Sequence, residues 1–159
     1  MNLRAYKSED IPAITSLFNQ VVEHGDAFLT DLPMTEVEMA KRLEDEQATY
    51  VAHVGLKIKG CYMLRPNSKG RSAHVANATY FVSEEFRGTG VGTLLANHSL
   101  KTAKTLGYKA MQFNSVVESN KASLNLWKKL GFQIVGEIPN GFRTLENTYV
   151  NTFILHKFL

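Results

Sequence analysis

Arg87-Gly88-Thr89-Gly90-Val91-Gly92 is the stretch that decides how this chain is built, because it joins an extended segment to a helical one. Its glycines have no Cβ atoms, so backbone N–H groups can approach an anion closely and the chain can adopt positive φ angles. The helix that follows starts with unpaired N–H donors and the positive end of its dipole. These features predict a binding site for a pyrophosphate group.

Other phosphate-binding loops have a different spacing of glycines. A dinucleotide fingerprint, G-x-G-x-x-G, would need a glycine where this chain has Thr93, and no Gly-Lys-Ser/Thr of a triphosphate-binding loop is present. Nicotinamide and triphosphate ligands are therefore disfavoured. A glycine turn that only caps a helix remains an alternative for the loop taken alone.

Upstream of the loop, the pattern predicts two helices after a short extended start at Leu3 to Tyr6. Apolar residues between Ile11 and Val22 recur at helical spacing, with Asp10 as the N-cap and Gly25 beyond the end. Thr35-Glu36-Val37-Glu38 has the pattern of a capping box and predicts the start of the second helix.

Around the loop, extended and helical stretches alternate. The expected strands are Thr49 to Val54, Ile58 to Leu64, Ala73 to Val82, Ala110 to Val117, Gln133 to Ile138 and Thr148 to Phe158, and the expected helices run from about Val91 to Leu106 and from about Lys121 to Leu130. The first two strands form an antiparallel hairpin, and residues 110–138 predict a βαβ unit. This order predicts an α/β sandwich with a mixed sheet.

Composition limits the classes of protein to consider. The 159 residues, 44% hydrophobic and 21% charged, suit one domain spanning residues 1–159. No apolar run is long enough to span a membrane and no secretion signal is present, so we expect a cytoplasmic protein without a membrane partner.

The formal charge of +3 comes from scattered basic residues, which favours a solvated surface or a phosphate-bearing ligand over nucleic acid. Cys61 is the one cysteine; it excludes an internal disulfide or a cysteine-based zinc site, and we expect it to be buried packing.

A second motif supports the glycine loop. Arg87-x-x-Gly90-x-Gly92 resembles the R/Q-x-x-G-x-G/A signature of the GNAT superfamily of acetyl-CoA-dependent N-acetyltransferases. The segment from Asn120 to Phe132, NKASLNLWKKLGF, resembles the other signature of that family, N-x-x-A/S-x-x-L-Y-x-K-L-G-F. The resemblance covers residues 49–138 well. It implies a three-layer α/β sandwich around a mixed, mostly antiparallel sheet of six to seven strands with one splayed pair.

The resemblance also implies where acetyl-CoA binds. It would lie in the V between the strand bearing Phe81 and the strand bearing Phe113, and no metal is expected. The residues implied to contact the cosubstrate are Phe81 and Val82 through their backbone, Arg87, Gly88, Thr89, Gly90, Val91, Gly92 and Thr93 at the pyrophosphate, and Asn120 and Ser123 at the pantetheine arm.

Two positions depart from the family pattern. Trp127 stands where many members have a tyrosine that protonates the departing thiolate, and an indole N–H can only donate a hydrogen bond; a catalytic role and simple core packing both stay open. Some members carry a glutamate as base on the strand before the loop, but this strand has Asn77 and no carboxylate. Asn77 can hold a water or the amine but cannot take a proton. His74 could take it if it faces the cleft, and an ordinary strand histidine is the alternative.

Asn77, Asn114 and Asn120 resemble the asparagines that fungal azetidine-2-carboxylate N-acetyltransferases use in their substrate pocket, and residues 130–140 are similar to the matching stretch of that group. The resemblance implies that Asn77 and Asn114 position a small amino or imino acid while water relays its proton. We expect direct acetyl transfer to the amine of a small molecule. Acetylation of a protein or peptide amine, and a CoA-binding sensor that is catalytically weak, remain alternatives; the loop from Gly25 to Pro33 should discriminate a closed pocket from a peptide groove. The last strand and the Phe142 to Tyr149 loop could serve a homodimer.

Overall fold

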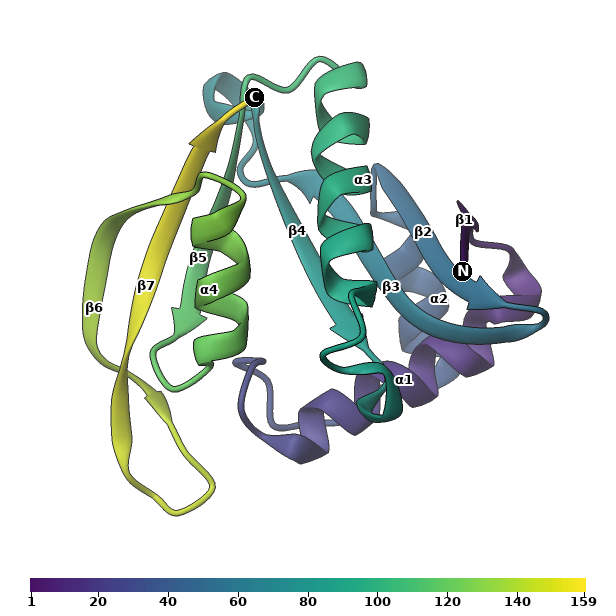
Figure 1. The fold of residues 1–159 in the computed structure, drawn as a ribbon, viewed down its shortest axis with the longest axis horizontal. Helices are drawn as coiled ribbons and strands as arrows, with labels where there is room; N and C mark the ends of the chain where they lie inside the picture. The colour runs from purple at the N-terminus through teal and green to yellow at the C-terminus, as the bar shows by residue number, and fades with distance from the viewer.

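A computed structural model describes all residues from 1 to 159. Seven strands form one sheet in the order β1-β2-β3-β4-β5-β7-β6, with helices on both faces (Figure 1). The strands are β1 (Asn2–Ala5), β2 (Ala48–Val54), β3 (Lys57–Pro66), β4 (Val75–Val82), β5 (Ala110–Val117), β6 (Gln133–Arg143) and β7 (Tyr149–Phe158). The helices are α1 (Ile11–His24), α2 (Glu36–Glu44), α3 (Val91–Thr105) and α4 (Lys121–Lys129). The predicted three-layer sandwich is confirmed.

The core lies on both faces of the sheet. On β3, Cys61 and Met63 belong to the apolar layer of α1 and α2, whereas Tyr62 and Leu64 belong to the layer on the opposite face, which includes residues of α3 and α4. Alternate residues of one strand therefore serve two apolar layers, as expected for a strand covered on both sides. No helix of the structure is long and apolar enough to cross a membrane.

Gly60 of β3 fixes the position of the N-terminus of α3. A Cβ atom at Gly60 would lie 2.9 Å from Leu95 Cδ1 and 3.1 Å from Val91 Cγ1. Only a residue without a side chain allows the first turn of α3 to pack this closely on the sheet. The start of that helix is consequently held directly over the sheet, next to β4.

The expected splayed strand pair is β4 and β5, which run parallel but pair only at Val75 with Ala110 and at Ala76 with Met111. Beyond these positions β4 continues along β3 and β5 continues along β7. Figure 1 shows the two strands diverging towards their C-terminal ends, with α3 and α4 on the face nearer the viewer. The prediction of a V-shaped opening in the sheet is confirmed.

Three local predictions need correction. β7 pairs with both β5 and β6, so the strands of the expected βαβ unit are separated by an inserted antiparallel strand. Asp10 precedes α1, but its carboxylate accepts hydrogen bonds from Arg4 at 2.6 and 2.8 Å and from the Lys7 N–H at 2.8 Å, and it does not cap the helix. The strand expected from Ala73 begins at Val75, because a 3₁₀ turn occupies Gly70–Ser72.

Other local predictions are confirmed. Gly25 ends α1 in the left-handed conformation, with φ of 67°. The capping box of α2 forms, since Thr35 Oγ1 accepts from the Glu38 N–H and Glu38 Oε2 accepts from the Thr35 N–H. Cys61 is fully buried, and burial raises the pKa of its thiol.

Candidate active site

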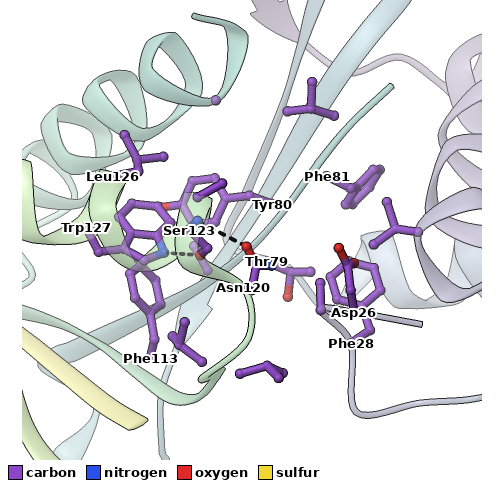
Figure 2. Close-up of a pocket in the computed structure, with 18 of the residues that line it drawn as sticks. Asp26, Phe28, Thr79, Tyr80, Phe81, Phe113, Asn120, Ser123, Leu126 and Trp127 are labelled. Carbon is purple, nitrogen blue, oxygen red and sulfur yellow. Dashed lines mark hydrogen bonds between the residues drawn. The ribbon is translucent and has the colours of Figure 1, made fainter. Parts of the chain in front are cut away.

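A cleft of about 730 Å³ occupies the opening between β4 and β5. Its lining comes from the segment between α1 and α2, from β4, from the glycine loop, and from β5 and α4. Figure 2 shows Phe81, Phe28 and Asp26 on one side of it and Trp127, Phe113 and Leu126 on the other. The predicted V is thus a real cavity large enough for a pantetheine arm and a small acceptor.

The glycine loop forms one end of the cleft and leaves backbone donors free. Gly88 and Gly90 have φ of 76° and 92°, and Cβ atoms at either position would meet nothing within 4 Å. The first helical hydrogen bond of α3 runs from the Leu94 N–H to the Gly90 carbonyl, so the N–H groups of residues 91–93 have no helical acceptor. The loop therefore has the geometry of an anion cradle at a helix start.

The structure divides the predicted cosubstrate residues into two groups. Phe81, Val82, Arg87, Gly88, Gly90, Gly92, Thr93, Asn120 and Ser123 line the cleft. Two members of the loop do not: the Val91 side chain is buried in the core, and Thr89 Oγ1 donates to the Phe86 carbonyl at 2.7 Å. Val91 can contribute to anion binding only through its backbone.

Trp127 is part of an aromatic cluster on the α4 wall. The residue is only 5% exposed, and its ring centroid lies 4.4 Å from that of Phe113 and 4.9 Å from that of Tyr80. Its indole N–H donates to Ser123 Oγ at 2.9 Å, while Asn120 Oδ1 accepts from the Ser123 N–H at 3.1 Å (Figure 2). The indole N–H and the Asn120 oxygen are therefore both engaged within α4, and Trp127 presents an aromatic face to the cleft.

An asparagine cluster joins the two diverging strands. Asn67 Oδ1 accepts hydrogen bonds from Asn77 Nδ2 of β4 at 2.9 Å and from Asn114 Nδ2 of β5 at 2.8 Å. Asn114 Oδ1 in turn accepts from Gln112 Nε2 at 2.9 Å. Asn67 thus bridges Asn77 and Asn114 across the two strands, whereas Asn120 lies apart at the start of α4. Asn67 was missed because it follows β3 in a turn and belongs to no motif.

His74, the alternative base, lies outside the cleft. Its ring is exposed ahead of β4, and Nδ1 is 3.2 Å from the Arg71 carbonyl oxygen. β4 begins at Val75, one residue after His74. The side chain of His74 therefore lies outside the alternation of strand side chains that directs Asn77 into the opening. His74 cannot serve as the base in this arrangement.

The segment between α1 and α2 supplies a carboxylate that the motifs did not single out. Asp26 lines the cleft; its Oδ2 lies 3.3 Å from His24 Nε2 and 3.6 Å from Arg87 Nη1, whereas its Oδ1 is buried with no hydrogen-bond partner. The side chain as a whole is 39% exposed, so the cleft can reach the carboxylate although this oxygen is covered. Its only sequence signal is its position in the Gly25 to Pro33 loop.

This fold and cleft define the class of enzyme that transfers an acyl group from a CoA thioester. The model of the acetyltransferase (GNAT) family matches residues 14–132, so the chain belongs to the GNAT family of N-acetyltransferases, which use acetyl-CoA as the acetyl donor.

Relatives of known name agree with this assignment. The chain is similar to the N-acetyltransferase aca1 of Schizosaccharomyces pombe, with 28% identity over 93% of this chain and 79% of that protein. It is also similar to the structure of a GCN5-related N-acetyltransferase from Kribbella flavida, with 31% identity, a TM-score of 0.93, and coverage of 99% of this chain and 97% of the other. A GNAT superfamily phosphinothricin acetyltransferase from Sinorhizobium meliloti, solved in complex with acetyl-CoA, shares the fold with a TM-score of 0.93 at 21% identity, over 99% of this chain and 88% of that one.

Proposed function

We propose that the chain transfers the acetyl group of acetyl-CoA directly to the amine of a small molecule, an amino or imino acid, within a ternary complex. The carrying observation is the single cleft that has free backbone N–H donors at one end and the Asn77–Asn114 pair between the diverging strands. Phe81, Val82, the loop from Arg87 to Thr93, Asn120 and Ser123 hold the cosubstrate in this proposal, and its thioester lies between β4 and β5.

The segment between α1 and α2 favours a small acceptor over a peptide. Phe28 stacks on Phe18 with ring centroids 4.9 Å apart and meets Phe81 edge-on at 6.3 Å, so the segment packs across the side of the cleft. Residues 26–30 all line the cavity. An enzyme that acetylates protein N-termini or lysines needs an open groove at this place, and the aromatic packing of Phe28 fills it.

The chemistry requires loss of a proton from the acceptor, because an alkyl ammonium near neutral pH has no free electron pair. The neutral amine then attacks the thioester carbonyl carbon; the C–N bond forms, the nitrogen loses a second proton, the C–S bond breaks, and its electron pair leaves with the CoA thiolate, which takes up that proton directly or through water. Asn77 and Asn114 position the amine but cannot accept its proton. Water relays the proton, and Asp26, whose side chain is 39% exposed, is the carboxylate in the cleft lining that can receive it.

Two measurements test this proposal. At 100 times its Kd, acetyl-CoA should stabilise the fold by about 2.7 kcal/mol, which for a chain of this size raises the Tm by about 5–10 °C. With acetyl-CoA present, thiol release should depend on an added amino or imino acid and should exceed that seen with a matched peptide. Absence of a Tm shift at millimolar acetyl-CoA would contradict the proposal. Binding without thiol release from any amine would favour a CoA-binding sensor instead.

A further inference from the structure

Two arginines that the cosubstrate does not require line the cleft near the asparagine pair. Arg42 comes from α2 and Arg65 from β3, and they converge on Thr79 of β4, whose Oγ1 lies 3.4 Å from Arg42 Nη2 and 3.2 Å from Arg65 Nη1. Glu46 lies behind them with its side chain only 3% exposed, 3.7 Å from Arg42 Nε and 3.3 Å from Arg65 Nη1. Glu46 does not line the cleft itself.

This cluster carries more positive than negative charge. Two guanidinium groups face one carboxylate, and burial raises the pKa of Glu46 against the opposing effect of the two arginines, so Glu46 neutralises at most one of them. The arginine side chains are 28% and 33% exposed, and both residues line the cleft. An excess positive charge at the wall of a partly closed cleft attracts an anionic group and disfavours polyamines and aminoglycosides.

Arg65 has hydrogen-bonding capacity that the protein does not use. Its side-chain hydrogen bonds to Glu46 and Thr79 all leave from Nη1. The Nε and Nη2 groups of a guanidinium form a planar fork that matches the two oxygens of a carboxylate. Arg42, in contrast, has all three side-chain nitrogens in contact with the protein: Nε with Glu46, Nη1 with the Met34 sulfur and Nη2 with Thr79. Arg42 therefore adds positive charge beside the Nε and Nη2 groups of Arg65.

The position of Arg65 fits the length of one small amino acid. Arg65 pairs with Asn77 across β3 and β4, and residues directly opposite in antiparallel strands have Cβ atoms about 4.5–5.5 Å apart. A ligand whose amine lies near Asn77 therefore has its neighbouring substituent within reach of the Arg65 fork. In an α-amino or α-imino acid that substituent is a carboxylate.

We propose that Arg65, oriented by Glu46 and Thr79 and supported by Arg42, binds the carboxylate of an α-amino or α-imino acid acceptor. This inference rests on the proposed function, because it assigns the acceptor end of the same cleft. Arg65 is a binding residue in this account, and Glu46 is the positioning residue that turns the fork towards the ligand.

The test compares L-azetidine-2-carboxylate and L-proline with their carboxamides by thiol release, with kcat/KM expressed per neutral amine because the carboxamide lowers the pKa of the neighbouring amine. The wild-type kcat/KM for the acids should exceed that for the amides by about 10- to 100-fold, because a charge-assisted hydrogen-bond pair is lost. Arg65→Gln should remove this preference, mainly by raising KM for the acids, and should leave the KM for acetyl-CoA and the rate with amides within about threefold. Arg65→Lys should restore part of the preference, since it keeps the charge and loses the fork.

Arg71→Gln is the matched control, because Arg71 is exposed and lies outside the cleft; it should change none of these values. Equal kcat/KM values for acids and amides in the wild type would overturn the proposal that Arg65 binds the carboxylate. So would an Arg65→Gln variant that loses both acceptors equally, which is the result for a purely structural ion pair. Thiol release with other amines but with neither acid would overturn the proposed role of Arg65 without contradicting the transferase activity. If no amine releases thiol, the proposed function fails. The role of Arg65 is then tested by the Tm in the presence of CoA. Equal Tm shifts with L-azetidine-2-carboxylate and its carboxamide would overturn that role.

Discussion

Gly92→Asp is expected to abolish acetyl-CoA binding without destabilising the protein. Gly92 lies in the first turn of α3, where its N–H group has no helical acceptor and the residue lines the cleft. A carboxylate placed there repels a diphosphate by several kcal/mol at about 4 Å in a partly shielded site, so affinity should fall by at least about 100-fold. The same carboxylate favours the helix dipole, and loss of a helical glycine removes a cost of about 1 kcal/mol. Calorimetric titration and thermal unfolding of the same sample give both values.

Gly92→Ala is the control for this prediction. A Cβ atom at Gly92 would meet Leu126 Cδ2 at 3.7 Å, an ordinary contact, and the family signature accepts Gly or Ala at this position. The alanine variant should bind acetyl-CoA within a few-fold of the wild type. If the aspartate variant binds as tightly as the alanine variant, the diphosphate does not lie at the start of α3.

Trp127→Ala should destabilise the fold severely. The indole is buried against Tyr80, Phe113 and Phe132, and truncation of a buried aromatic residue costs about 3–5 kcal/mol. That loss is a large share of the roughly 5–15 kcal/mol that stabilises a typical domain. Denaturant unfolding should show it as a lower midpoint with an unchanged slope. The neighbouring exposed Lys128→Ala should stay within about 0.5 kcal/mol of the wild type.

Trp127→Phe separates packing from catalysis. It keeps one aromatic ring in the cluster, loses part of the indole volume, and removes the N–H that now donates to Ser123. If Trp127 acts as a wall of the cleft, kcat should fall by less than about tenfold. A fall of about 100-fold or more with unchanged stability would instead mean that the indole N–H leaves Ser123 and stabilises the departing thiolate.

Local patterns predicted the fold well where one motif decides one element. The capping box at Thr35, the left-handed end at Gly25 and the glycine loop before Val91 each depend on neighbours in the chain, and the structure has all three. The insertion of β7 between β5 and β6 depends on pairing between strands distant in sequence, which periodicity does not encode. The carboxylate of Asp10 binds Arg4 of β1 instead of capping α1, and this local ion pair is not part of the helix pattern that predicted the cap.

The candidate site was predictable only where it belongs to a motif. The glycine loop and the Asn120 to Phe132 segment carried most of the residues that line the cosubstrate end of the cleft. Asp26, Arg42 and Arg65 come from three separate elements, and only the tertiary fold brings them to one cavity. From the sequence alone, Arg42 is a basic residue in the last turn of a helix, where an exposed side chain is the ordinary expectation.

The expected homodimer, and the expected absence of a metal and of nucleic-acid binding, stay predictions. Ile134, Val135 and Ile138 are exposed on β6, which is an edge strand. Such an apolar edge is compatible with a second copy of the chain, and sedimentation of the purified protein measures it.

In the proposed complex, the backbone of the glycine loop holds the diphosphate of acetyl-CoA at the start of α3. Amide chemical shifts of Gly88, Gly90 and Gly92 during titration with CoA, and separately with pantetheine, test it most directly. CoA should shift these three amides strongly, and pantetheine, which has no diphosphate, should perturb β4 and β5 but leave them nearly unmoved. Equal shifts with both ligands, or CoA binding that leaves the three amides unchanged, would contradict the account.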